Sequence, residues 1–281
     1  RLDILGLGRE DFPMHSARRG AMTAGNRLYL GSADGFHPEG SPGAATLSRA
    51  GWAWGVAELD VENDGRPDYF FATGHETRAS QRDYERQFWL HDIYLAGSTN
   101  DPAAELYFRA AGARRVGEQA SYGGWQHQAL LRAEASGHFT ESSWLSGVGL
   151  LADGRNALAA DFDGDGRLDL AVTTFEGWPE VRQRVVIYRN ETPQAGHWIG
   201  VRFAAGAGRK SGVNTRVEIQ TAAGIRRRWL VTGESYRSQQ TMQAHFGLGA
   251  ESEVKSATVI WADGTRSVLN APAVDHWHAA P

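Results

Sequence analysis

The chain has 281 residues, a formal charge of −4 and no cysteine. The lack of cysteine excludes disulfide scaffolds, thiolate nucleophiles and cysteine-ligated metals. The slightly acidic charge, without a basic tract, argues against nucleic-acid binding. No apolar run approaches the roughly 20 residues of a membrane-spanning helix, so we expect no transmembrane segment.

The pattern of apolar residues predicts an all-β protein. Glycine occurs 34 times, about 12% of the chain against a typical ~7%, which indicates dense turns. Short segments alternate apolar and polar residues and end in Gly, Asp or Asn, as strands do. We expect such strands at 27–31, 68–74, 169–174, 184–190, 197–203, 215–221, 226–233 and 256–264. Two short helices are predicted, around Ser80–Trp89 and at Pro102–Leu106.

The sequence repeats itself. DVENDGRPDYFFATG from Asp60 matches DFDGDGRLDLAVTT from Asp161, and NRLYLGSADGFH from Asn26 matches HQALLRAEASGHFTE from His127. Internal similarity of this kind is typical of repeat architectures. Arg1–Ile4 aligns with the end of the second acidic motif, so we expect the sequence to be the C-terminal part of a longer protein. The lack of a visible signal peptide then says nothing about secretion.

Each repeat contains the acidic pattern D-x-D-x-D-G-x-x-D, with Glu at the third position of the first copy. Side chains at positions 1, 3, 5 and 9 converge when the backbone curls, and the position-7 carbonyl points inward. Oxygen ligands of this number and flexibility suit Ca²⁺, whereas Mg²⁺ rarely uses an all-protein cage. The predicted ligands are Asp60, Glu62, Asp64, Arg66 (carbonyl) and Asp68, and Asp161, Asp163, Asp165, Arg167 (carbonyl) and Asp169.

Two other interpretations of the acidic pattern are weaker. Asp and Gly are common in polar turns that bind no ion, but a second match at the equivalent place in a repeat makes this interpretation much weaker. An EF-hand is disfavoured because β-like segments flank the loops and no Glu stands at position 12. Glu62 and Pro67 depart from the second copy, so the first site is expected to be the weaker one.

The segments Gly51–Gly74 and Asn156–Thr174 resemble FG-GAP/VCBS repeats, the calcium-binding blades of integrin-type β-propellers. HWIGVRF, GESYRSQQ, HFGLG and VIWADGT, after residue 196, resemble an ASPIC/UnbV domain. This order of parts is similar to that of bacterial relatives of cartilage acidic protein. The resemblance implies partial propeller blades over 1–192, with an insertion at about 75–125, and a β-rich ASPIC/UnbV domain over 193–281.

The same resemblance implies calcium binding and a secreted, periplasmic or cell-surface location, but no settled reaction. We therefore expect a calcium-binding module that binds a protein or a glycan, as part of a larger assembly if other subunits exist. The alternative is an enzyme or accessory protein of small-molecule (natural-product) biosynthesis, with a site between propeller and C-terminal domain. Such a site would lie near His127, Glu134 or Trp125.

Other polar residues favour structural roles. His245 lies in a predicted core strand, where a structural histidine is more common than a general base. His276 and His278 are expected in an exposed tail rather than at a transition metal. Arg226 and Arg228 are expected to be exposed on one face of a strand, as a solvated charge cluster or a site for an anionic partner.

Overall fold

The computed structural model describes residues 25–38, 42–84, 102–203 and 212–281. These residues form mostly strands, with two helices, α2 (Pro42–Leu47) and α4 (Pro102–Glu118). The predicted all-β class is confirmed. No helix among the described residues is long and apolar enough to cross a membrane. The alignment of Arg1–Ile4 with the second acidic motif falls outside the described residues.

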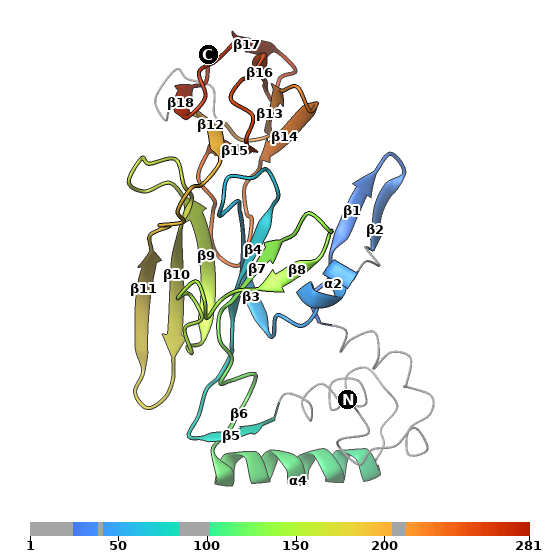
Figure 1. Cartoon of the computed structure of the whole chain (residues 1–281). Coiled ribbons are helices and arrows are strands. Elements are labelled where there is room, and N and C mark those ends of the chain that lie inside the picture. The colour runs from blue at the N-terminus through green and yellow to red at the C-terminus, as the bar shows by residue number, and fades with distance from the viewer. Residues whose placement is uncertain (1–24, 39–41, 85–101, 204–211) are drawn as a thin grey trace.

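Two antiparallel sheets form the middle of the molecule (Figure 1). The first has the order β3-β4-β7-β8, with β3 at Ala53–Leu59, β4 at Asp68–Thr73, β7 at Ala129–Ala133 and β8 at Phe139–Glu141. The second has the order β11-β10-β9, with β9 at Gly154–Ala160, β10 at Asp169–Glu176 and β11 at Arg182–Tyr188. Alternate residues of β3 are buried, which is the pattern predicted for a strand with one face on a core.

The two sheets pack face to face. Gly55 of β3 lies so close to the backbone of β9 that a Cβ atom there would overlap the Arg155 carbonyl. The shared core contains Ala57, Leu59, Phe70, Ala72, Leu130, Val148, Ala157, Ala159, Leu168, Leu170 and Val172. Burial of this apolar surface, at about 25 cal/mol per Å², is the main force that holds the sheets together.

Smaller elements cover the other face of the first sheet. Leu47 of α2 packs with Phe71, Ala129 and Leu131 in a second core cluster. The hairpin of β1 (Tyr29–Ser32) and β2 (Gly35–Pro38) precedes this helix.

The stretch at about 75–125, predicted to be an insertion, contains β5 (Ser80–Asp83), α4 and β6 (Ala120–Ser121). The prediction of a helix around Ser80–Trp89 is wrong where the structure describes it, because Ser80–Asp83 pairs in parallel with β6; residues 85–89 lie outside the described part. The helix predicted at Pro102–Leu106 is confirmed and is longer, at 17 residues. Pro102 at its start and Glu105 in its first turn suit a helix N-terminus.

The C-terminal part consists of two further sheets. One has the order β15-β12-β18 and the other β14-β13-β16-β17. The strands are β12 (His197–Arg202), β13 (Thr215–Gln220), β14 (Ile225–Leu230), β15 (Gln243–Gly249), β16 (Ser256–Ile260), β17 (Arg266–Asn270) and β18 (His276–Ala279). They enclose one core that includes Ile199, Val217, Phe246, Val259 and Trp261. The predicted domain boundary at 192/193 lies between the end of β11 and the start of β12.

The C-terminal sheets lie at one end of the two packed sheets, and α4 and β5 lie at the opposite end (Figure 1). The turns that join β3 to β4 and β9 to β10 point toward the C-terminal sheets. Both acidic loops are therefore at the junction between the two parts.

Candidate metal centre

The two acidic loops occupy the same position in their sheets. In each, the ninth residue of the motif pairs with the residue before the first, Asp68 with Leu59 and Asp169 with Ala160. Position 4 has a positive φ in both loops, 57° at Asn63 and 81° at Gly164, and so does position 6, at 84° in Gly65 and 86° in Gly166. Glycine and asparagine adopt this conformation at low cost, which explains their places in the motif.

In the first loop, carboxylate oxygens of Asp60, Glu62 and Asp68 lie within 4.8 Å of one another. Asp60 Oδ1 accepts from the Asp64 amide at 2.9 Å, and Oδ2 accepts from the Gly65 amide at 2.7 Å. Asp68 accepts from the amides of Val61 at 2.9 Å and Ala133 at 2.7 Å. Asp60 and Asp68 are 2% and 1% exposed, so backbone amides fix two nearly dry carboxylates side by side.

Burial changes the acidity of these two groups. It raises the pKa of Asp60 to about 7, against the opposing hydrogen bonds from Gly65 and Asp64. Burial likewise raises the pKa of Asp68 to about 6. A bound cation would relieve this cost, because it favours the charged form of each carboxylate.

The second loop repeats the cluster with Asp161, Asp163 and Asp169, whose oxygens also lie within 4.8 Å. Asp161 accepts from the amides of Gly164 at 2.7 Å and Gly166 at 3.1 Å. Asp169 accepts from the amides of Phe162 at 3.0 Å and Asn190 at 2.7 Å. Burial raises the pKa of Asp169. Asp163 is exposed, so this loop is the more open of the two to water.

The two clusters contain some of the predicted ligands but not all of them. The two clusters contain the acids at positions 1, 3 and 9 of each motif. The position-5 acids are instead paired with the arginine two residues later, Asp64 with Arg66 and Asp165 with Arg167. Arg132 also forms an ion pair with Glu62, and Arg189 Nε lies 2.7 Å from Asp163 Oδ2.

The donor sets fit a hard divalent cation. Each offers three carboxylates without nitrogen or sulfur, which is the oxygen chemistry that Ca²⁺ prefers. In the first loop, the Oδ1 atom of Asn63 is buried and has no hydrogen-bond partner among the described residues. A buried polar atom without a partner is costly, and an ion or water is one of its ordinary explanations.

The C-terminal part contacts the first loop through its backbone. The Gly196 amide donates to the Glu62 carbonyl, and the Gly249 amide donates to the Asn63 carbonyl, both at 2.7 Å. A side chain at Gly247 would overlap Asp60 and Asn63.

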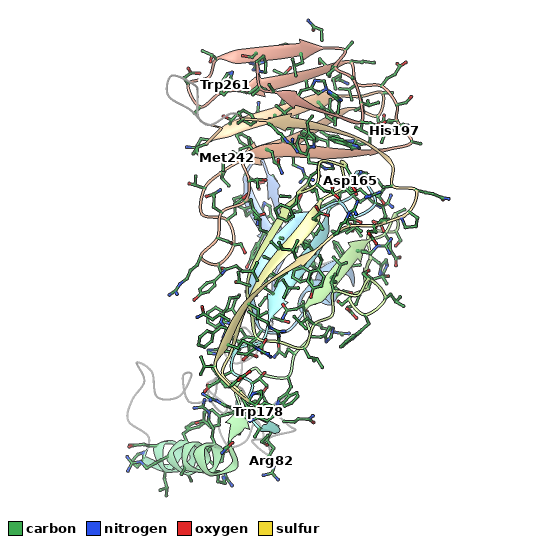
Figure 2. All side chains as sticks on the ribbon, turned by 90° about the vertical axis from the view of Figure 1, so that its left-hand side faces the viewer. Arg82, Asp165, Trp178, His197, Met242 and Trp261 are labelled. Carbon is green, nitrogen blue, oxygen red and sulfur yellow. The ribbon has the colours of Figure 1, made fainter. Side chains whose placement is uncertain are left out.

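Aromatic side chains contact the second loop. The Trp277 indole donates to Asp161 Oδ2 at 2.6 Å, and His245 Nε2 donates to the Gly166 carbonyl at 2.9 Å. Trp198 fills the space that a Cβ atom at Gly166 would need. The side-chain view shows Asp165 close beneath the C-terminal sheets, with Trp178 and Arg82 at the far end (Figure 2).

Sequence reasoning did not find these contacts. Trp277 is 116 residues from Asp161, and no motif spacing connects them. Asn190, which donates to the Val61 carbonyl at 3.0 Å and so connects the two loops, was likewise not identified. Trp277 can be seen in the sequence, but its hydrogen-bond partner is determined by the tertiary structure.

The structure tests three predictions about other polar residues. His245 is 6% exposed in β15, and burial lowers its pKa to about 4, as expected of a structural histidine. The predicted exposed tail is wrong, because His276–Ala279 pairs with β12. The predicted exposure of Arg226 and Arg228 is also wrong, because they reach the Gly247 carbonyl and Glu58, respectively.

The side chains of the residues suggested for an enzyme site contact different neighbours and not one another. His127 packs beside Trp144, with Nε2 3.6 Å from Glu141 Oε1. Glu134 bonds Ser136 and Thr140 in the β7–β8 turn, whereas the Trp125 ring lies against Trp178. A cavity of about 490 Å³ lies beside β11, lined by residues such as Trp144, Leu151 and Tyr188, and not at the junction with the C-terminal part.

Comparison with known proteins characterises part of the chain. Residues 206–279 match the family model of ASPIC and UnbV. The chain is also similar to mouse (Mus musculus) cartilage acidic protein 1, with 33% identity over 125 residues, 42% of this chain and 18% of that protein. The match thus spans less than a fifth of the mouse protein. The C-terminal part of this chain carries an ASPIC/UnbV domain.

Proposed function

We propose that the chain is a calcium-binding module built from FG-GAP/VCBS-type propeller blades and an ASPIC/UnbV domain. The observation that carries the proposal is the pair of three-carboxylate clusters at equivalent turns of two packed sheets. Two clusters with the same backbone pattern are hard to explain as unrelated polar turns. Asp60, Glu62 and Asp68 would hold one ion, and Asp161, Asp163 and Asp169 the other, with the Arg66 and Arg167 carbonyls as further ligands.

The position of the clusters suggests a structural role. Ca²⁺ supplies positive charge to carboxylates that otherwise repel one another. Asp60 and Asp68 join the ends of β3, β4 and β7, because Asp68 also accepts from Ala133 at the end of β7. Asp169 in the same way joins β10 to Asn190, just after β11. The proposed role is to hold these strand ends, and the ASPIC/UnbV domain above them, in a fixed arrangement.

We place this module outside the cytoplasm, secreted, periplasmic or on the cell surface, where it binds a protein or a glycan. Sites of the extracellular type have a Kd of roughly 0.1–1 mM, so about 1 mM Ca²⁺ stabilises the fold by ~0.4–1.4 kcal/mol per site. A surface for such a partner is offered beside β11, where Trp144 and Leu145 are 59% and 93% exposed.

Differential scanning calorimetry tests the calcium proposal. We expect the melting temperature to rise by about 2–8 °C when EDTA is replaced by 1 mM Ca²⁺, from the free energies above and the usual conversion for a chain of this size. Asp161→Ala and Asp163→Ala should each reduce this rise, whereas Glu105→Gln, on α4 at the opposite end of the molecule (Figure 1), should not. An unchanged melting temperature in wild-type protein would contradict the proposal.

A further inference from the structure

The second loop has a contact that the first lacks. Asp161, the first residue of its motif, accepts from the Trp277 indole of β18 in addition to the amides of its own loop. In the first loop, the equivalent Asp60 accepts from amides of that loop, and Gly247, which has no side chain to donate, lies against its carboxylate. The first aspartate of the motif therefore has different partners in the two loops.

Trp277 is itself firmly held. Gly200 of β12 leaves the space in which the Trp277 ring lies, and a Cβ atom there would overlap the ring. The Arg202 guanidinium lies over the ring, 4.1 Å from its centroid, and its Nη2 atom lies 3.6 Å from Asp161 Oδ2. The ring is also 5.3 Å from Trp198 and 5.7 Å from His245. A donor fixed on several sides can set the orientation of the carboxylate that it binds.

Trp198 and His245 complete the contact. Their rings stack at 5.5 Å, with 16° between the planes, directly over Gly166. His245 Nε2 must carry a proton, because the Gly166 carbonyl can only accept. The Gly166 carbonyl also accepts from the Asn63 side chain at 3.1 Å, which links the two loops. The ASPIC/UnbV domain thus contacts the second loop at both position 1 and position 6 of the motif.

We propose that Trp277 is a positioning residue for the second calcium site, so that calcium binding and docking of the ASPIC/UnbV domain are coupled. This inference rests on the proposed calcium function. The coupling is reciprocal, so the factor by which docking raises calcium affinity is also the factor by which bound calcium favours docking. The loop that is correctly shaped for the ion is also the loop that accepts from Trp277 and His245.

Isothermal titration calorimetry with CaCl₂ on the full chain tests the coupling. Trp277→Phe keeps an aromatic ring and removes the indole donor, and we expect it to weaken one of two sites at least fivefold and leave the other within twofold. Trp261→Phe is the matched control, because Trp261 lies in the core of the same domain and donates at 3.0 Å to Ser267, away from the loops. It should leave both sites unchanged.

The outcomes separate the two proposals. If wild-type protein binds calcium and Trp277→Phe binds it equally well at both sites, the coupling is refuted and the calcium function stands. If wild-type protein binds none, both are refuted. A purely structural role of Trp277 would lower the melting temperature in EDTA without changing calcium affinity, and this result also counts against the coupling.

Hydrogen exchange on wild-type protein gives a measurement that needs no variant. The amides of Gly196 and Gly249 donate across the junction to the first loop, and we expect calcium to slow their exchange at least tenfold. The amides of His75 and Glu76, which donate to the Gly123 carbonyl at 2.8 Å and the Tyr122 carbonyl at 2.9 Å, are the internal control. Both hydrogen bonds lie within the 75–125 stretch and do not cross the junction. Equal exchange with and without calcium at Gly196 and Gly249 would overturn the coupling.

Discussion

The two acidic loops share a motif, a register and a backbone conformation, yet they lie in different surroundings. The first contains two nearly dry carboxylates and meets the C-terminal part through backbone at Gly196, Gly247 and Gly249 and through the Arg226 side chain beside Gly65. The second has an exposed Asp163 and meets the C-terminal part through the aromatic rings of Trp198 and Trp277. The sequence pattern therefore sets the shape of such a loop, while the residues that pack on it determine its electrostatics and its coupling to the rest of the molecule.

The largest effect should come from adding a methyl group under the aromatic rings. Gly166 has a φ of 86°, and a Cβ atom there would overlap Trp198, so we expect Gly166→Ala to lower the free energy of unfolding by about 3–4 kcal/mol. At Gly65, with a φ of 84°, the Cβ atom would meet the flexible end of Arg226, and about 2 kcal/mol is expected.

Gly264→Ala is the control for both. Its φ is 81° but nothing lies within 4 Å of the added atom, so it reports the backbone cost alone, about 1 kcal/mol. Urea denaturation in EDTA measures all three. Equal losses at Gly166 and Gly65 would show that the two loops are not held differently.

The second prediction concerns pH. Burial raises the pKa of Asp60 to about 7 and of Asp68 to about 6, so the folded state binds more protons than the unfolded state at these two groups. Their contribution to stability is therefore largest below the unfolded pKa near 4 and is lost as pH rises to 7. His245, with a pKa lowered to about 4 by burial, opposes this between pH 4 and 6.5, because the unfolded state then binds its proton.

The raised pKa values of Asp60 and Asp68 outweigh the lowered pKa of His245, so the free energy of unfolding falls as the pH rises. Without calcium we expect the free energy of unfolding to decrease by about 2–4 kcal/mol between pH 4.5 and pH 7.5, at about 1.4 kcal/mol per proton and pH unit. Calcium should remove the contribution of Asp60 and Asp68, because it binds the deprotonated groups, and leave the opposite contribution of His245, so that stability no longer falls with pH. Calorimetry across this range, with and without calcium, checks it. A slope that is the same in both conditions would contradict the assignment of the slope to the first loop.

The smallest effects should come from the arginines that now pair with the cluster acids. Arg132→Gln releases Glu62 in the first loop, and we expect calcium affinity there to rise about two- to fivefold. Arg189→Gln releases Asp163 at a more exposed position, and the rise should be about twofold or less, because exposed ion pairs contribute at most ~1 kcal/mol. Titration calorimetry of the two variants would contradict this order if the second gained more than the first.

Much of this architecture could be predicted from the sequence, because alternation of apolar residues encodes which face of a strand is buried. Each of the eight predicted strands is present, and the acids at positions 1, 3 and 9 come together in both loops. The pairing of Asp64 and Asp165 with arginines was not predicted, since it depends on side-chain orientation. The strand β18 was missed because its partner β12 is almost eighty residues away.

Helix α4 shows a different limit. Its sequence is rich in Ala, Arg and Glu, which favour a helix. Gly112, however, has a low helix propensity, and no broad apolar stripe runs along the segment. Packing of Phe108 and Ala111, which are 3% and 5% exposed, is a tertiary property that the pattern does not reveal.

Equilibrium dialysis against radioactive calcium, on the intact chain at 1–5 mM Ca²⁺, tests the central claim most directly. Two ions bound per chain are expected near saturation, falling to one in Asp60→Ala and, separately, to one in Asp161→Ala. No bound calcium in the wild-type chain, or the same number in all three proteins, would contradict the assignment of these loops as metal sites.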